Sequence, residues 1–313
     1  MQLVERLVGG DARALARAIS LVEEAAPRAV EALRAAFPHT GRATVLGVTG
    51  SPGAGKSSLV DRLVASFRSE GRKVGVVAVD PSSAYSGGAI LGDRVRMQGH
   101  AVDEGVFIRS MASRGHLGGL SRAASDAVDL LDAAGFDPVI VETVGVGQDE
   151  IEIAKAADVV AVVLVPGMGD DIQAIKAGIL EIADLFVINK ADRPGADRVA
   201  ADLEYVMSLA PAQGGRARPP IYRTVAVRDD GVAELKDGIL RWVAATSPDL
   251  RAARRRERAE MRLTAILVGR WMGTVRERIL GGAAFAETIS EIADRRLDPY
   301  TAADRVLERV EIR

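Results

Sequence analysis

The chain has 313 residues, of which 48% are hydrophobic and 27% charged, so it can bury a sizeable globular core. Its net charge of −2 provides no basic field that would recruit nucleic acid or an anionic membrane. The lack of cysteine excludes disulfides, thiolate metal sites and cysteine catalysis, and the three histidines are too widely spaced for a metal cluster. No secretory signal and no run of ~18 apolar residues is found, so we expect a cytoplasmic protein without a membrane or nucleic-acid partner.

The predicted elements change character twice along the chain. Residues 1–40 are expected to form a helical arm, because Asp11 suits an N-cap and apolar residues after it recur at helical spacing. Residues 41–248 alternate strands with helices, which predicts an α/β domain with a mostly parallel sheet. Several of the strands are unbroken aliphatic runs, so we expect helices on both faces of the sheet. They are predicted at 44–49, 73–79, 106–109, 138–142, 159–165, 185–189 and 221–224.

Residues 249–313 are predicted to be a C-terminal helical arm. Its first helix is rich in arginine between residues 251 and 262, and the interleaved Glu257 and Glu260 favour a solvated face over a nucleic-acid surface. The same helix carries a long apolar stripe, which either the α/β domain or a second copy of the chain must cover. The stripe consists of Leu263, Ile266, Leu267, Trp271, Val275 and Ile279.

A phosphate-binding loop is predicted at residues 50–57, which match G-x-x-x-x-G-K-[ST] between a strand and a helix. Its glycines let backbone N–H groups turn inward around phosphate oxygens, and the following helix directs its positive end at them. We expect Lys56 to face solvent in the empty loop and to pair with the β- and γ-phosphates, and Ser57 to bind Mg²⁺. The alternative is a glycine-rich turn without a ligand. The predicted nucleotide-binding residues here are Gly50, Pro52, Gly53, Ala54, Gly55, Lys56, Ser57 and Ser58.

A guanine-binding motif is predicted after the strand 185–189, where the chain reads Asn-Lys-Ala-Asp and matches the N-K-x-D box of GTP-binding proteins. Asp192 would pair with the N1–H and exocyclic amine of guanine, groups that adenine does not present in that arrangement. Asn189 would brace the loop and the Lys190 stem would cover the base. A four-residue match can arise by chance, but its place in the same sheet as the phosphate loop argues against chance. The guanine is expected to meet Thr224, Val225 and Ala226 on its other side.

A switch segment is predicted at residues 142–148, Glu-Thr-Val-Gly-Val-Gly-Gln, at the end of the strand 138–142. A carboxylate at a strand end reaches the hydration shell of Mg²⁺, and a glycine three residues later offers its N–H to the γ-phosphate, so the loop could sense hydrolysis. Glu142 stands where aspartate is usual, and its length suits contact through water. Gln148 is a candidate for orienting the attacking water, with a structural amide as the alternative.

Two further acids follow the second predicted strand. A carboxylate at this edge of a sheet lies in the ligand crevice, whereas the alternative for Asp80 is a turn before Pro81. Asp80 is expected to position the hydrolytic water or to bind magnesium. Asp93 is expected to hold Mg²⁺ directly or through water.

Four segments together resemble the MeaB/ArgK family of GTPases: SPGAGKSS, VDPSS with GGAILGDRVRM, VETVGVGQDE, and PGMGDDIQAIKAGILEIADLFVINKAD. The similarity runs almost continuously from residue 47 to 192. It implies a P-loop NTPase that hydrolyses GTP and acts as a chaperone of adenosylcobalamin-dependent acyl-CoA mutases. Such a chaperone gates the loading of the cofactor and the removal of damaged cobalamin. By position, the family's nucleotide and magnesium residues fall on Lys56, Asp80, Asp93 and Glu142.

The resemblance also implies a partner and an assembly. Its extra switch loop, which contacts the mutase, falls on residues 167–176, with Gly167, Asp170, Asp171 and Lys176 as the coupling residues. The family forms homodimers through C-terminal helices, which suits the apolar stripe. The expected client is methylmalonyl-CoA mutase, and mutases of isobutyryl- or 2-hydroxyisobutyryl-CoA remain alternatives.

Three other classes of nucleotide-binding protein are alternatives to the mutase-associated GTPase. A kinase or ATPase of basic amino-acid transport would prefer adenine, against which Asp192 argues. A GTPase that inserts nickel would be expected to carry cysteine and histidine ligands. A targeting GTPase that binds signal peptides would have a methionine-rich apolar domain, whereas seven methionines are scattered along this chain.

Overall fold

The computed structural model describes residues 2–81, 98–100, 102–113, 122–143, 156–167, 182–209, 218–275 and 282–308. The chain divides into two compact units, Met1–Arg254 and Arg255–Arg313. The helical arm expected at residues 1–40 lies within the first unit, and the three-domain division of the chain stays a prediction.

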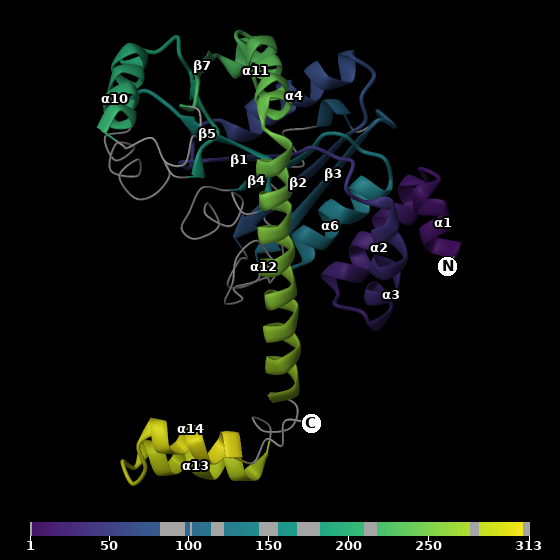
Figure 1. Cartoon of the computed structure of the whole chain (residues 1–313), viewed down its shortest axis with the longest axis vertical. Coiled ribbons are helices and arrows are strands. Elements are labelled where there is room, and N and C mark those ends of the chain that lie inside the picture. Colours follow the sequence, from purple (N-terminus) through teal and green to yellow (C-terminus); the bar gives the residue numbers. More distant parts are fainter. Residues whose placement is uncertain are drawn as a thin grey trace. The chain divides into compact units, whose positions relative to one another are not determined.

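The first unit is built on a parallel sheet whose seven described strands run in the order β3-β2-β4-β1-β5-β6-β7 (Figure 1). The phosphate-loop strand therefore lies at the centre, between β4 and β5. All seven predicted strands are present, which confirms the α/β fold, and the second and third extend further than expected. The strands are β1 (Val45–Gly50), β2 (Val74–Pro81), β3 (Val106–Ser113), β4 (Val139–Thr143), β5 (Val159–Leu164), β6 (Leu185–Asn189) and β7 (Ile221–Thr224).

Two hydrophobic layers explain why the strands are unbroken aliphatic runs. Successive side chains point to opposite faces, so Val139 and Val141 join one layer and Ile140 joins the other. The first layer is closed by α1 (Gln2–Val8), α2 (Ala12–Glu23), α3 (Pro27–Ala36), α6 (Arg122–Ala133) and α10 (Ala196–Leu209). The second is closed by α4 (Lys56–Ser69) and α11 (Val232–Ala245). The short 3-10 turns are η1 (Phe37–His39), η2 (Gln98–His100) and η4 (Ala226–Arg228).

The N-terminal helices are attached to the sheet by polar contacts as well as by the first layer. Asp11 caps α2 by accepting hydrogen bonds from the backbone N–H groups of Arg13 and Ala14 at 2.9 and 3.0 Å, as the sequence predicts. Arg109 of β3 forms an ion pair with Glu23 of α2. This arm is therefore part of the same packed body as the sheet.

The long helix α12 (Pro248–Val275) begins in the first unit. Its arginines are not all solvated, which corrects the sequence-based expectation for Arg254. That side chain donates to the carboxylate of Asp184 at 2.8 Å and to the backbone oxygen of Asp158 at 2.7 Å. Asp184 is 2% exposed, so a buried carboxylate far away in sequence requires this cation.

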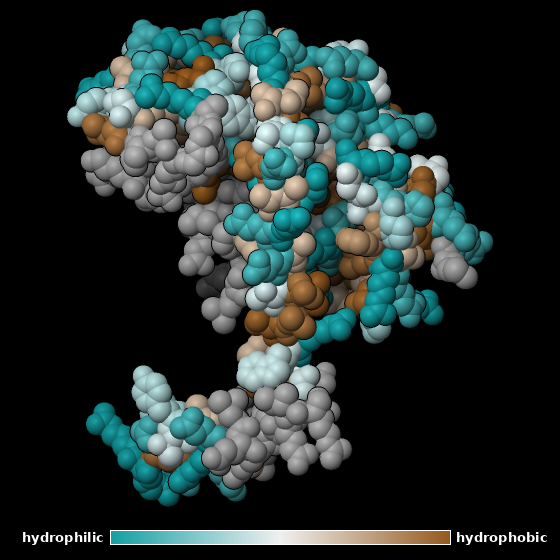
Figure 2. Space-filling view, in the orientation of Figure 1, coloured by the Kyte–Doolittle hydropathy of each residue, from teal (hydrophilic) through white to brown (hydrophobic). Residues whose placement is uncertain are grey.

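The second unit contains the rest of α12, with α13 (Ala283–Ala293) and α14 (Pro299–Glu308) packed against each other. Apolar side chains gather toward the C-terminal end of α12, where Figure 2 shows them on the surface. Leu263 and Leu267 are both 58% exposed and Trp271 is 45% exposed. No described helix has both the length and the apolar character needed to cross a membrane.

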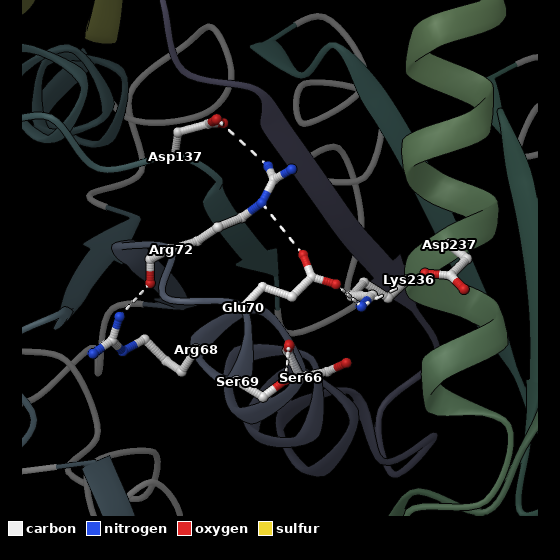
Figure 3. A network of polar contacts seen from close by, with 8 residues as sticks. All are labelled: Ser66, Arg68, Ser69, Glu70, Arg72, Asp137, Lys236 and Asp237. Carbon is white, nitrogen blue, oxygen red and sulfur yellow. Dashed lines mark hydrogen bonds and ion pairs between the residues drawn. The ribbon is translucent and has the colours of Figure 1, made fainter.

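A polar network joins the C-terminal end of α4 to α11 (Figure 3). Lys236 of α11 forms an ion pair with Glu70. Oε2 of Glu70 also lies 3.6 Å from Nε of Arg72, and Nη1 of Arg72 contacts Oδ2 of Asp137. The hydrogen bond to Glu70 raises the pKa of Lys236 above its ordinary value of 10.5. The helix that starts at the phosphate loop is thus fixed at its far end to the helix that follows β7.

We predict that Lys236→Met lowers the free energy of unfolding by roughly 1 kcal/mol, since Glu70 is 40% exposed and water screens the pair. A raised pKa means that the pair stabilises the fold fully below the ordinary lysine pKa, and that this contribution is lost as pH rises through the higher pKa of the folded state. Urea denaturation at about pH 8 and above about pH 11 should therefore show that the difference in free energy of unfolding between parent and variant becomes smaller at high pH. Arg241→Met, an exposed position of the same helix, is the control. A difference in free energy of unfolding that does not change with pH would contradict the stabilising role of the Lys236–Glu70 ion pair.

Candidate nucleotide-binding site

The phosphate-type loop joins β1 to α4 at the carboxyl edge of the sheet, where parallel α/β folds bind ligands. Gly50 has φ +136, and a Cβ there would lie 2.1 Å from the backbone oxygen of Val163 on β5. Gly55 has φ +83, and its Cβ would lie 2.5 Å from Nδ2 of Asn189. Both glycines are therefore required by close approach as well as by backbone conformation, and the loop lies directly against β5 and the end of β6.

Lys56 is the first residue of α4, and its side chain is held inside the loop. The residue is only 5% exposed, and its Nζ donates to the backbone oxygens of Gly50 at 2.6 Å and Ser51 at 3.0 Å. The expectation that it faces solvent is wrong, because a buried ammonium group needs acceptors and the loop carbonyls supply them. The cation is nonetheless held against the carbonyls at the start of the loop.

Ser57 and Glu142, predicted separately as magnesium ligands, are brought into contact. The Ser57 hydroxyl donates to Oε1 of Glu142 at 2.7 Å, and the two residues are 7% and 5% exposed. Their contact follows from the register of neighbouring strands, in which Val48 of β1 pairs with Glu142 of β4. Hydroxyl and carboxylate oxygens are ligands that suit Mg²⁺, so the pair fits that ion.

The described residues contain no group of three or more acidic or histidine side chains that could hold a metal by themselves. A magnesium ion beside Ser57 and Glu142 would need ligands beyond the described acidic and histidine side chains, and phosphate oxygens and water are ligands that this ion commonly takes. The site is suited to a metal that arrives with a phosphorylated ligand.

Asn189 connects the phosphate-type loop to the segment after β7. It is 2% exposed, and its Nδ2 donates to the backbone oxygen of Ala54 at 2.8 Å. Its Oδ1 accepts from the hydroxyl of Thr224 and the backbone N–H of Ala226, both at 3.2 Å. One amide thus uses both its donor and its acceptor to hold three loops together.

Two further residues of the motif, Lys190 and Asp192, also contact neighbouring loops. Lys190 has φ +55, and its Nζ donates to the backbone oxygen of Gly53 at 2.7 Å. Asp192 is more exposed, and its Oδ2 lies 3.3 Å from Nη1 of Arg228. Arg228 was missed by the sequence analysis, because it belongs to no motif and only its place shortly after Thr224 could have indicated it.

Several predicted residues lie outside the described part of the chain, namely Asp93, Gln148, Asp170, Asp171 and Lys176. Asp80 is described only in its backbone, which continues β2 in register with Ala112 of β3. The backbone of β2 therefore runs through Asp80 to Pro81, and the role of the Asp80 side chain stays a prediction. Gly167 follows β5 with φ +95.

A parallel sheet with this loop after its central strand and an Asn-Lys-Ala-Asp motif after β6 defines a P-loop GTPase. Residues 15–278 match the family described as methylmalonyl Co-A mutase-associated GTPase MeaB, and the chain belongs to that family.

Individual relatives agree with this assignment. The chain is 49% identical over 313 residues to a protein of Pyrococcus abyssi named as a GTPase, covering 99% of this chain and 96% of that protein. It is 41% identical over 249 residues to the GTPase ArgK of Escherichia coli, covering 77% and 75% of the two chains. The crystal structure of an LAO/AO transport system kinase superposes with a TM-score of 0.72 at 29% identity, covering 98% of this chain and 96% of that one.

We predict that Lys56→Ala reduces GTP hydrolysis by about a hundredfold or more, the usual effect of removing one group that stabilises transition-state charge. The nucleotide-free protein should still fold, with a melting temperature lower by a few degrees, since the carbonyls of Gly50 and Ser51 lose a donor. Lys73→Ala, at an exposed position immediately before β2, is the matched control. Hydrolysis that survives in Lys56→Ala would exclude this loop as the phosphate site.

Proposed function

We propose that this protein is a GTP-hydrolysing G-protein chaperone of an adenosylcobalamin-dependent acyl-CoA mutase. It would gate loading of the cofactor and protect or reactivate the mutase, with methylmalonyl-CoA mutase as the first candidate and isobutyryl- or 2-hydroxyisobutyryl-CoA mutases as alternatives. The observation that carries the GTP-binding part is the Asn189 amide, which joins a guanine-type motif to a phosphate-type loop. The family's description supports the mutase part.

The phosphate end of the proposed site uses the loop and the start of α4. Backbone N–H groups of the loop residues other than Pro52, together with the N-terminus of α4, would bind the phosphate oxygens. Lys56 would exchange its two carbonyl acceptors for the β- and γ-phosphates, and an ammonium bonds a phosphate anion more strongly than a neutral carbonyl. Gln148 would orient the attacking water.

Ser57 and Glu142 are the described residues that would hold Mg²⁺, with Asp80 and Asp93 as the remaining candidates. The ion, when bound with GTP, would neutralise charge on the β- and γ-phosphates. The two described side chains already meet in a buried position, so they require little rearrangement to bind it.

The guanine end lies between two loops. Asp192 would accept the N1–H and exocyclic amine of the base, while the Lys190 stem and the segment from Thr224 to Ala226 would lie on either side of it. The hydrogen bonds of Asn189 and the bond from the Ala191 N–H to the Thr224 carbonyl at 3.0 Å support this placement, because they hold the two loops side by side.

We predict that Asp192→Asn weakens GDP binding by about a hundredfold, the value of roughly 3 kcal/mol for two hydrogen bonds to a charged group. The same change should improve binding of xanthosine diphosphate, whose carbonyl at the amine position accepts a hydrogen bond from the new amide. Calorimetric titration of both nucleotides measures this, with Asp197→Asn, a 91% exposed carboxylate on α10, as the control.

The rival function is a kinase or ATPase linked to basic amino-acid transport, which the similarity to the solved LAO/AO transport system kinase favours. This reading expects adenine nucleotides to bind at least as tightly as guanine nucleotides. Titration of the parent protein with ADP and GDP separates the two functions, and equal affinity would overturn the proposed GTPase chaperone.

Coupling to the mutase is proposed for residues 167–176, through Gly167, Asp170, Asp171 and Lys176. Gly167 has a left-handed backbone directly after β5, at the same edge of the sheet as the phosphate-type loop, which supports a loop that departs from the nucleotide site. The motif resemblance supplies the rest of this proposal.

We predict that Lys176→Ala keeps basal GTP hydrolysis within about threefold of the parent and loses the acceleration that a purified acyl-CoA mutase confers. The reason is that a coupling residue contacts the partner and not the reacting phosphate. GTP turnover with and without methylmalonyl-CoA mutase, together with transfer of adenosylcobalamin into it, is the measurement. Unchanged stimulation in the variant would place the loop outside the coupling path.

We also propose that the protein forms a homodimer through α12. Leu263, Leu267 and Trp271 are exposed on one helix, and an exposed apolar patch rimmed by charge is typical of a surface that another protein covers. No membrane or nucleic-acid partner belongs to the proposed function.

A further inference from the structure

Arg228 lies at the solvent end of the proposed guanine site and contacts two carboxylates. Its Nη1 is 3.3 Å from Oδ2 of Asp192, and its Nε is 3.0 Å from Oδ2 of Asp230. The Arg228 side chain is 55% exposed, so these contacts hold it at the rim and not in the core. The guanidinium therefore donates to Asp192 through Nη1 and to Asp230 through Nε, so it bridges the two carboxylates.

The backbone that carries Arg228 is fixed at both of its ends. Val225 and Asp230 exchange backbone hydrogen bonds, with the Val225 N–H donating at 3.0 Å, and Asp229 adopts φ +62 to close the turn. Ala226 is tied to the amide of Asn189. The guanidinium therefore extends from a short closed turn that is anchored to the same motif that contains Asp192.

We propose that Arg228 is a positioning residue for guanine recognition, which holds the Asp192 carboxylate in the orientation that accepts the base. This rests on the proposed function, in which Asp192 binds guanine. An ionised carboxylate accepts about four hydrogen bonds, so Arg228 on Oδ2 leaves room for the two that guanine donates. Base and arginine are bound together, and the arginine is not displaced.

Arg228 is expected to raise the affinity for guanine by ordering the Asp192 carboxylate before the base binds. Asp192 is 38% exposed, so without a partner its carboxylate would rotate freely and would have to be ordered when the base binds. An exposed ion pair contributes little, and salt weakens it further. Arg228 should therefore change guanine affinity by a small factor that depends on Asp192, and it should leave adenine nucleotides unaffected.

The test is a double-mutant cycle on the full chain, with GDP and ADP affinities measured by calorimetry. Arg228→Ala should weaken GDP binding by roughly threefold to tenfold at low salt and less at high salt. Arg228→Lys should recover most of the loss. In the Asp192→Ala background, Arg228→Ala should cause no further loss. The matched control is Arg223→Ala, since Arg223 is 50% exposed, lies on β7 and pairs with Asp197 instead of Asp192.

The inference is overturned if Arg228→Ala changes GDP affinity no more than Arg223→Ala does, or if the loss persists in the Asp192→Ala background. Tighter GDP binding by Arg228→Ala would also overturn it, because the arginine would then compete with the base. Melting temperatures of the nucleotide-free variants exclude unfolding as the cause of any loss. Failure of the proposed function is recognised separately, by a parent protein that binds ADP as tightly as GDP or whose GDP affinity does not respond to Asp192→Ala.

Discussion

The interaction on which the rest of the site depends is the set of hydrogen bonds made by the Asn189 amide. This side chain is 2% exposed, and its NH₂ group and carbonyl are satisfied by different loops, Ala54 on one side and Thr224 with Ala226 on the other. A buried amide that lost either partner would pay the full desolvation of the orphaned group. The phosphate-type loop and the base-side loop are therefore held at a fixed separation before any nucleotide binds.

The sheet makes this arrangement possible. In a parallel sheet all carboxyl ends lie at one edge, so β1, β4, β6 and β7 deliver the phosphate loop, Glu142, Asn189 and Thr224 to the same place. The helices on both faces bury the strands and fix their register. The contact of Glu142 with Ser57 is a direct product of that register, because β4 is the immediate neighbour of β1.

The sequence predicted β1, β4, β5 and β6 well because each is buried on both faces and therefore reads largely as an aliphatic run. Short motifs at strand ends also indicated residues that the structure brings into contact, Ser57 with Glu142 and Asn189 with Thr224 and Ala226. Prediction from the sequence failed where a contact joins distant segments without a local pattern. Arg254 looks like one more solvated arginine until Asp184 is placed beside it, and Arg228 carries no signal until the turn closed by Val225 and Asp230 directs it toward Asp192. The orientation of Lys56 depends on how the loop carbonyls turn, which composition does not encode.

The position of Lys56 has a consequence for how a nucleotide would leave. A lysine enclosed in a loop without acceptors would carry an unsolvated charge once its anion departed, and that penalty would oppose dissociation. The ammonium group donates to the carbonyl oxygens of Gly50 and Ser51. In the proposed function these acceptors would take the place of a departing phosphate, which would lower the free energy of the nucleotide-free loop and favour turnover over permanent retention.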